Sequence, residues 1–375
     1  MHAFLFPGQG SQHLGMGQDL FDRYPKQTST ASEILGYDIR QLCLEDAQKQ
    51  LGQTQFTQPA LYVVNALSAM AKRDSGLEPM FVAGHSLGEY NALAYAGVFS
   101  FEDGLRLVQK RGALMSTAPA GSMAAVIGID ADTVKAALAD AALDELDIAN
   151  INGPKQTILS GPTEALERAQ AVMESRQAMF IPLNVSGAFH SRYMAPVKAE
   201  FEAFVAGFTF SSPSLPVIAN VTAQPHALPD IAQLLGQQLV EPVRWVESMD
   251  YLLDAGATDF IECGPGDVLT KLIRGIRTQP RAPKVQPAST AAPVANHTEK
   301  GPTSASATSN QQPIDPAIDV KNWNDAYPVG TLVSVAGQQS PIKTRSPATI
   351  LFGHRAAVYL EGFQGYFALS DIKPV

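Results

Sequence analysis

Short apolar stretches alternate with longer amphipathic ones from residue 1 to residue 277, and this alternation constrains the fold more than any other feature of the chain. The predicted strands lie at residues 2–6, 80–83, 217–220 and 259–263. The predicted helices between them include residues 59–72, 101–115 and 191–208. Strands that alternate with helices favour an α/β fold in which helices cover both faces of a parallel sheet.

A different pattern interrupts this alternation between residues 123 and 189. Strands are predicted at residues 123–129, 147–152, 156–161 and 178–185, and helices at residues 131–141 and 163–176. The resulting β-α-β-β-α-β order is typical of the ferredoxin-like arrangement. We therefore predict a ferredoxin-like domain at residues 123–189, inserted in an α/β core formed by residues 1–122 and 190–277.

The last part of the chain changes character. Seven prolines fall between residues 280 and 316, among stretches such as "ASTAAP" and "TSASATSN". Such a segment buries too little apolar surface to offset its ordering entropy, so residues 278–319 are predicted to form a flexible linker. Residues 320–375 are predicted to form a small β-rich module with a docking or scaffolding role. Its aromatic residues are expected in a core rather than against a ligand; they are Trp323, Tyr327, Phe363 and Tyr366.

Composition and charge exclude several classes of function. The formal net charge of −9 disfavours nucleic acid as the main partner, because there is no overall basic excess. The two cysteines, Cys43 and Cys263, lie far apart without partners at metal-ligand spacing, so we expect no metal site and a reduced compartment. The opening "MHAFLFPGQGSQ" is unlike a signal peptide, and no window approaches a membrane helix. We expect a cytoplasmic location, no membrane association and no cofactor.

The motif "GHSLG" at residues 84–88 carries the strongest chemical signal in the sequence. It places Ser86 between a predicted strand and a predicted helix, which is the context that a nucleophile elbow requires. Glycines on both sides allow a sharp turn, and free N–H groups at the helix start favour developing negative charge. The alternative is an ordinary helix cap, since G-x-S-x-G alone occurs often by chance.

A nucleophilic serine needs a base, and His190 in "GAFHS" is the best candidate among the seven histidines. It falls where the predicted insert returns to the core, a natural cleft edge. His226 lies in a predicted loop beside a proline and is a weaker candidate. The turn "FPGQGSQ" at residues 6–12 follows a strand and could bring backbone N–H groups to an oxyanion; a phosphate-binding loop is the alternative.

Six motifs together resemble one enzyme family. "FPGQGSQ", "GHSLGEY", "QKRGALM", "NGPKQTILSG", "GAFHS" and "ECGPGDVLT" occur in the order seen in malonyl-CoA:acyl carrier protein transacylases, including the free-standing acyltransferases of polyketide synthases. The resemblance covers about residues 1–277. It implies an α/β-hydrolase-like core with a ferredoxin-like insertion, and transfer of malonyl from malonyl-CoA to the phosphopantetheine thiol of an acyl carrier protein for polyketide or fatty acid synthesis.

The resemblance also implies roles for individual residues. Ser86 would attack the malonyl thioester and hold the acyl group as an ester, with His190 as its base. Gln238 in "GQQLVEPVRW" occupies the position whose backbone carbonyl orients the histidine in the family. Backbone N–H groups of Gln9 and Leu87 would hold the oxyanion.

Two further residues would set the choice of acyl group. Arg111 in "QKRGALM" stands where family members use an arginine to grip the free carboxylate of malonate. A planar guanidinium can hold a carboxylate by two parallel hydrogen bonds. Without the resemblance, a helix-surface arginine is about as good a reading. Phe189 resembles the "AFH" pattern associated with malonyl over methylmalonyl selection, and its ring would fill the space of an α-methyl group.

Two other functions stay open at the level of sequence. One is an acyl hydrolase that clears stalled acyl chains from carrier proteins, although an arginine at position 111 suits an acyl group that ends in a carboxylate. The other is a non-enzymatic docking subunit, which would be expected to lose Ser86, His190 or Arg111. An acidic carrier protein would need a local basic surface on this acidic chain. The candidates for that surface are Arg192, Lys198, Lys271, Arg274 and Arg277.

Overall fold

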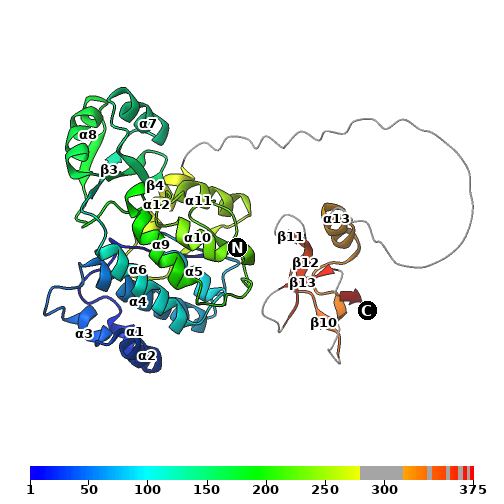
Figure 1. Cartoon of the computed structure of the whole chain (residues 1–375). Coiled ribbons are helices and arrows are strands. Elements are labelled where there is room, and N and C mark those ends of the chain that lie inside the picture. Colours follow the sequence, from blue (N-terminus) through cyan, green and yellow to red (C-terminus); the bar gives the residue numbers. More distant parts are fainter. Residues whose placement is uncertain (279–315, 336–339, 352–354, 362–365, 370–371) are drawn as a thin grey trace, which may run out of the picture. The chain divides into compact units, whose positions relative to one another are not determined.

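The chain forms two units, Met1–Gln279 and Pro280–Val375 (Figure 1). The computed structural model describes residues 1–278, 316–335, 340–351, 355–361, 366–369 and 372–375. The predicted linker at residues 278–319 therefore lies almost wholly outside the described residues. Each unit is described here by itself.

Four parallel strands form the central sheet of the first unit. They are β1 (His2–Phe6), β2 (Phe81–Gly84), β7 (Val217–Ile218) and β8 (Asp259–Glu262), in the order β7-β2-β1-β8. All three pairings are parallel, as the alternation of strands and helices predicts. The predicted strands agree with these bounds to within two residues.

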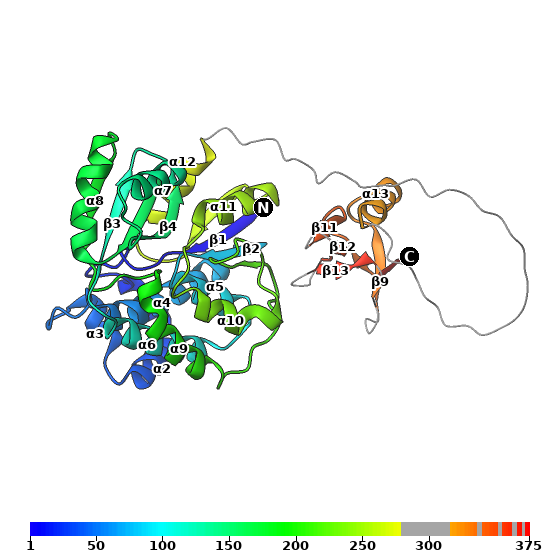
Figure 2. The same ribbon diagram turned by 45° about the horizontal axis from the view of Figure 1, so that its top comes forward.

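Alternate side chains of β1 enter two different cores, because successive residues of a strand point to opposite faces of the sheet. Phe4 and Phe6 belong to the larger core, whereas Ala3 and Leu5 belong to the smaller one. Figure 2 shows helices on both sides of β1 and β2. The larger core includes residues of α4 (Thr54–Asp74), α5 (Gly88–Tyr95), α6 (Phe101–Ser116), α9 (Ala195–Val205) and α10 (Ile231–Gln237). The smaller core includes residues of α11 (Trp245–Asp254) and α12 (Val268–Arg277).

Several helices differ from the predicted ones. Helix α4 begins at Thr54, five residues before the predicted start at Pro59. The prediction missed this first part because polar residues there, such as Gln58, are buried and interrupt the apolar pattern of the helix. The single helix predicted at residues 191–208 is a 3₁₀ turn, Arg192–Met194, followed by α9, which starts with a proline in its first turn. The short helices near the N-terminus were not predicted; they are α1 (Gln18–Arg23), α2 (Pro25–Leu35) and α3 (Ile39–Leu44).

A second, antiparallel sheet follows helices α1–α6 in sequence. Its strands are β3 (Ser122–Ile127), β4 (Asp147–Gly153), β5 (Gln156–Gly161) and β6 (Met179–Pro182), in the order β4-β5-β3-β6. Two helices, α7 (Ala131–Asp140) and α8 (Thr163–Ser175), pack on it around a separate core. This part lies at one end of the unit and α1–α3 lie at the other (Figures 1 and 2).

One backbone contact joins the antiparallel sheet to the segment before α11. Ile151 donates its N–H to the carbonyl of Val243 at 3.0 Å, and Val243 donates to the carbonyl of Ala149 at 2.9 Å. The parallel bridge between Asn150 and Val243 therefore ties β4 to the chain that carries Gln238.

The second unit contains α13 (Pro316–Ala326) and two three-stranded sheets among its described residues. The first sheet has β9 (Leu332–Val335) between β10 (Ile342–Lys343) and β14 (Ile372–Pro374). The second has β12 (Arg355–Tyr359) between β11 (Thr349–Leu351) and β13 (Tyr366–Ala368). Helix α13 was not predicted, and it spans the predicted boundary between linker and module.

The aromatic residues of the second unit differ in their environments. Trp323 is buried in the small core, as predicted. The prediction that Tyr327 lies in a core is wrong. This residue is exposed after α13, and its ring lies against that of Trp323. Phe363 lies outside the described residues, and Tyr366 lies in β13. Within the described parts of both units, no helix is long and apolar enough to cross a membrane.

Candidate active site

The site is built on the turn between β2 and α5. A Cβ atom on Gly84 would lie 1.8 Å from the carbonyl carbon of Gly88, and one on Gly88 would lie 2.0 Å from the carbonyl oxygen of Phe6. Only glycine fits at either position, since a real side chain would displace backbone. Between them Ser86 has a φ of 51°, a left-handed conformation that a non-glycine residue holds only when its surroundings impose it. This strained serine turn has the geometry of a nucleophile elbow.

The structure brings Ser86 and His190 together, although 104 residues separate them in sequence. The Oγ atom of Ser86 lies 2.7 Å from Nε2 of His190. On the other side of the ring, Nδ1 lies 2.7 Å from the backbone carbonyl of Gln238. A carbonyl only accepts, so Nδ1 carries the proton and Nε2 is left as the acceptor for the serine hydroxyl. Gln238 is therefore placed where the resemblance implies, with its main chain at the histidine.

The electrostatic environment keeps His190 neutral. Burial, and then the positive charge of Arg111, lower the pKa of His190 to about 3. Both causes disfavour the charged imidazolium. A neutral imidazole with a free Nε2 is the form that can accept a proton from Ser86.

Arg111 reaches the same point from α6 and is not a helix-surface arginine. It is 1% exposed, and its Nη2 atom lies 3.1 Å from the Oγ atom of Ser86. Two side-chain amide oxygens hold the guanidinium: that of Gln58 accepts from Nη1 at 2.7 Å, and that of Gln238 accepts from Nη2 at 3.0 Å. The Nε atom is buried and has no hydrogen-bond partner among the described residues. The two amides thus hold the guanidinium with its Nη2 atom beside the serine.

The turn after β1 approaches the elbow closely. A Cβ atom on Gly8 would lie 2.5 Å from the carbonyl oxygen of His85, so the two turns are in backbone contact. The side chain of Gln9 donates from Nε2 to the hydroxyl of Thr54 at 3.3 Å. Among the hydrogen bonds of residues 1–278, none uses the backbone N–H of Gln9 or of Leu87. These donors remain available to a ligand.

Phe189 lies directly before the histidine and is 4% exposed. Its ring packs against Gly187, where an added Cβ atom would lie 2.8 Å from the ring. His190 itself has a φ of 55°, so this segment turns sharply between the two residues. Phe189 is therefore a buried residue whose ring packs on the backbone just before the histidine that faces Ser86.

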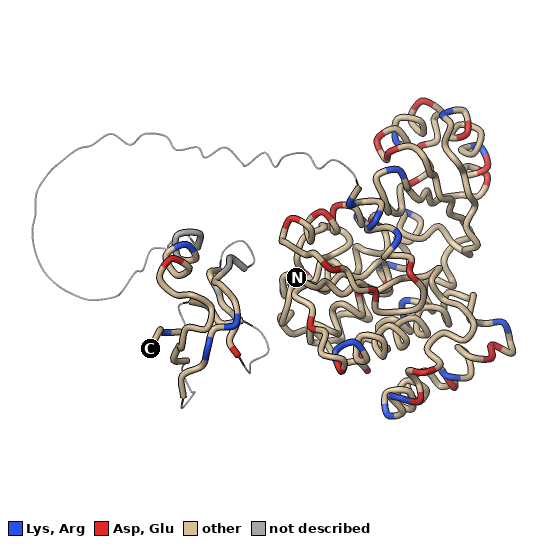
Figure 3. The backbone as a smooth tube through the Cα atoms, turned by 180° about the vertical axis from the view of Figure 1, so that it is seen from behind, with Lys and Arg blue, Asp and Glu red and all other residues tan. Residues whose placement is uncertain are grey.

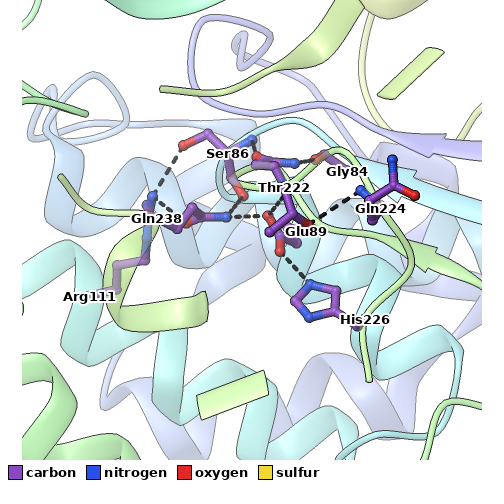
Figure 4. Close-up of polar contacts among 9 residues, drawn as sticks. Gly84, Ser86, Glu89, Arg111, Thr222, Gln224, His226 and Gln238 are labelled. Atoms are coloured by element: carbon purple, nitrogen blue, oxygen red, sulfur yellow. Dashed lines mark hydrogen bonds and ion pairs between the residues drawn. The ribbon is translucent and has the colours of Figure 1, made fainter. Parts of the chain in front are cut away.

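Four polar residues of the site were not predicted from sequence. Gln58 supports Arg111, and Asn220 accepts the backbone N–H of Ser86 at 2.7 Å through its side-chain oxygen. His226, set aside as a loop residue, is buried and lies 2.6 Å from the carboxylate of Glu89. Figure 4 shows Glu89 between His226 and Gln238. One signal for Glu89 was present, since it is the only charged residue of the α5 helix, which is otherwise rich in alanine and leucine.

A groove of about 580 Å³ opens beside His190. Its lining includes three basic residues, Lys135, Arg192 and Lys198. Two of the five basic residues predicted to receive a carrier protein line this groove, and both have acidic partners: Arg192 pairs with Asp147, and Lys198 pairs with Glu202. Elsewhere Lys271 pairs with Asp267, and Arg277 donates to the carbonyl of Thr258. Basic and acidic residues lie interspersed over the first unit (Figure 3).

The fold and the site define a class: an α/β protein with a serine on a nucleophile elbow, a neutral histidine within hydrogen-bond reach and an arginine at the serine. In the described part of the chain, no group of three or more His, Cys, Asp or Glu side chains lies together as metal ligands would. The model of the acyl transferase domain family matches residues 3–311, so the chain belongs to this family.

The chain is also similar to individual curated proteins. It is 52% identical over 285 residues to the polyketide biosynthesis malonyl CoA-acyl carrier protein transacylase PksC of Bacillus subtilis (strain 168), covering 75% of this chain and 99% of that protein. It is 53% identical over 281 residues to the polyketide biosynthesis protein ThaF of Burkholderia thailandensis, covering 74% of this chain. The chain spans only 24% of the length of that relative.

Solved structures show the same fold. A malonyl CoA-acyl carrier protein transacylase from Burkholderia pseudomallei is 48% identical and superposes with a TM-score of 0.73, covering 75% of this chain and 99% of that one. A malonyl-transacylase in complex with its type II polyketide synthase acyl-carrier protein is 36% identical, with a TM-score of 0.70, covering 73% of this chain and 92% of that one.

Proposed function

We infer that the chain transfers a malonyl group from malonyl-CoA to the phosphopantetheine thiol of an acyl carrier protein, through an ester on Ser86. The single observation that carries this inference is the buried guanidinium of Arg111, whose Nη2 atom lies 3.1 Å from the Oγ atom of Ser86. An acyl group with a terminal carboxylate is the substrate that complements a fixed cation at that place.

In the first half-reaction, the Ser86 hydroxyl gives its proton to Nε2 of His190 while Oγ attacks the thioester carbonyl. The tetrahedral intermediate then collapses, the C–S bond breaks, and the imidazolium returns the proton to the leaving thiolate of coenzyme A. The carbonyl of Gln238 stabilises the transient imidazolium by accepting from Nδ1.

Backbone N–H groups of Gln9 and Leu87 are proposed to hold the oxyanion of that intermediate. Their two turns meet at the contact between Gly8 and His85, and neither donor is used within residues 1–278. Donors that are already in place when charge develops stabilise the transition state without reorganisation.

Arg111 is proposed to bind the malonyl carboxylate and so to place the thioester carbon over Ser86. The amide oxygens of Gln58 and Gln238 fix the plane of the guanidinium before substrate arrives. Phe189, the buried residue directly before His190, is proposed to fill the space of an α-methyl group and to favour malonyl over methylmalonyl.

In the second half-reaction, the phosphopantetheine thiol of the carrier protein gives its proton to His190 and attacks the malonyl ester. The C–O bond to Ser86 breaks, and the serine oxygen recovers the proton from the imidazolium. The groove beside His190 is the proposed entry for both thiol-bearing partners. Since its basic residues are paired with acidic ones, contact with an acidic carrier would exchange these pairs.

The acyl hydrolase alternative is not favoured, because the relatives at 38–53% identity include several named malonyl CoA-acyl carrier protein transacylases. The docking-subunit alternative is disfavoured by the site itself. A docking subunit would be expected to lose Ser86, His190 or Arg111. All three are present, and His190 and Arg111 each lie within hydrogen-bond distance of Ser86.

The proposed function is tested by a transfer assay with the full chain, malonyl-CoA and a phosphopantetheinylated acyl carrier protein, read by mass spectrometry of the carrier. We expect malonyl-carrier to form with the wild type and formation to stop in Ser86→Ala. Ser214→Ala is the matched control, because that serine lies outside the site and bonds only to the backbone of Ala96. Malonyl transfer by Ser86→Ala at the wild-type rate would contradict the proposal.

We also propose that residues 123–189 form a ferredoxin-like insertion in an α/β-hydrolase-like core of residues 1–122 and 190–277. The strand order β4-β5-β3-β6, the two crossover helices and the separate core support this assignment. The β-rich module at residues 320–375 and its docking role stay predictions, as does the cytoplasmic location.

A further inference from the structure

A buried carboxylate lies behind the site without taking part in the proposed steps. Glu89 is the second residue of α5 and is 1% exposed. His226, whose side chain is fully buried, lies with Nε2 at 2.6 Å from one carboxylate oxygen of Glu89. The second oxygen accepts from Nε2 of Gln238 at 2.7 Å and from the backbone N–H of Asn220 at 3.1 Å. A buried charged group with this many partners stabilises a specific arrangement.

The two ends of the Gln238 amide meet opposite charges. Its nitrogen donates to the carboxylate of Glu89, and its oxygen accepts from the guanidinium of Arg111 (Figure 4). A carboxylate only accepts and a guanidinium only donates, so chemistry allows one orientation of this amide. The same nitrogen also donates to the backbone carbonyl of Ser86 at 3.0 Å.

Gln238 contacts three parts of the proposed machinery: the base, the carboxylate clamp and the elbow. Its backbone carbonyl receives Nδ1 of His190, its amide oxygen receives Arg111, and its amide nitrogen holds the backbone of Ser86. A change in the amide therefore reaches the base, the carboxylate clamp and the elbow at once. The elbow is held from the far side too, since Asn220 accepts the N–H of Ser86 and donates to the carbonyl of Gly84.

We propose that Glu89 and His226 form a positioning pair that fixes the amide orientation of Gln238. Through that amide, the pair sets the position of the Arg111 guanidinium and thereby the selectivity for acyl groups that end in a carboxylate. Neither residue reaches the substrate; both act through Gln238. This inference rests on the proposed function, because it concerns how the malonyl carboxylate is received.

Replacement of Glu89 by glutamine removes the carboxylate that fixes the orientation of the Gln238 amide. An amide at position 89 can offer either an oxygen or an N–H group, so Gln238 can turn its nitrogen toward Arg111, where two donors then face each other. A mispositioned guanidinium of Arg111 binds the malonyl carboxylate less well. Acetyl-CoA has no such carboxylate, so its rate does not depend on this contact. Both substrates share any effect on His190, so the ratio of their rates isolates the clamp.

The test is the ratio of kcat/KM for malonyl-CoA to that for acetyl-CoA, measured for acylation of the full chain. In Glu89→Gln we expect this ratio to fall roughly ten- to hundredfold, the scale of a lost buried charged hydrogen bond. The folded fraction cancels from the ratio, so a merely structural defect would leave it unchanged. Leu252→Ala is the control for stability, because that side chain is fully buried in the other core, which contains none of these residues.

A second pair of variants keeps the test decisive if Glu89→Gln folds poorly. His226→Gln retains an N–H donor for Glu89 and should keep the ratio near that of the wild type. His226→Leu removes the donor, leaves one carboxylate oxygen unpaired and should lower the ratio.

A wild-type ratio in both Glu89→Gln and His226→Leu would overturn the positioning pair while leaving the proposed function intact. A wild type that shows no preference for malonyl, or no transfer, would contradict the proposed function itself. The two failures are therefore distinguishable in one experiment.

Discussion

Replacement of Arg111 by alanine removes the only cation that touches Ser86 in the described structure. In the wild type, the malonyl carboxylate would be received by a guanidinium that is 1% exposed, so water screens the pair little. In Arg111→Ala the same carboxylate would enter a buried site without a counter-ion. Loss of one partner of a buried hydrogen-bonded charge pair costs about 2–5 kcal/mol.

That free energy converts into a rate. At about 1.4 kcal/mol for each factor of ten, kcat/KM for malonyl-CoA should fall roughly 30- to 4,000-fold. Acetyl-CoA carries no carboxylate and should lose less than about tenfold. The substitution also removes the donor to the side-chain oxygens of Gln58 and Gln238, which costs about 1–3 kcal/mol of stability for each oxygen left unsatisfied.

The assay is the rate of acyl-enzyme formation with each of the two thioesters, followed by intact mass. Thermal unfolding of the variant shows that the protein remains folded at the assay temperature. Arg111→Lys is the matched variant: it keeps the charge but lacks the planar fork, and we expect it to fall between wild type and alanine. An unchanged malonyl-to-acetyl ratio in Arg111→Ala would refute the carboxylate clamp.

Four further predictions concern the site and the chain. Because burial and Arg111 lower the pKa of His190 to about 3, its imidazole stays neutral in mild acid, so kcat/KM for acylation should stay flat from pH 8 to about pH 5; an acid limb centred near pH 6.5 would contradict this. The same lowered pKa makes the unfolded chain bind the proton more readily, so the free energy of unfolding should decrease as pH falls from about 6.5 toward 3 in chemical denaturation. Phe189→Leu should raise the use of methylmalonyl-CoA relative to malonyl-CoA by about 5- to 150-fold in a competition assay. The same selectivity as in the wild type would show that Phe189 does not set the choice between the two. Deletion of residues 278–375 should leave malonyl transfer to an isolated carrier protein largely intact, and complete loss of transfer would contradict a purely docking role.

The parts of the site that sequence predicted are those with local causes. The elbow around Ser86 was predictable because its glycines and its strand–turn–helix context lie within a few residues of one another. The close approaches at Gly84 and Gly88 give the physical reason for both glycines. The strand β1 was predicted at its observed bounds for a similar reason, since its apolar run is short and is stopped by Pro7.

The supporting residues depend on contacts that span the chain. Gln58 meets Arg111 only because α4 packs on α6, and 53 residues separate the two in sequence. His226 finds its partner Glu89 across 137 residues, so a proline-flanked loop gave no sign that its side chain would be buried. Helix α4 was predicted too short for the same reason: its polar first turns are buried by the site they support.

The second unit shows another limit. The prediction of a small β-rich module rested on short apolar runs, and these appear as strands such as β9 and β12. In "PAIDVKNWNDA" the apolar residues of α13 alternate with charged and polar ones without a clear amphipathic pattern, and the helix contributes Trp323 to the small core that also contains Val333 and Val358. Local pattern alone therefore could not assign it.

The central claim is that Ser86 carries malonyl as an ester and passes it to a carrier thiol. The most direct measurement is intact mass and peptide mapping of the wild-type chain after brief exposure to malonyl-CoA, removal of the free thioester, and incubation with or without phosphopantetheinylated carrier protein. The account predicts a malonyl adduct on the peptide that contains Ser86, stable in buffer and moved to the carrier when it is added. An adduct on another residue, or an adduct that is lost to water as fast as to the carrier, would contradict it.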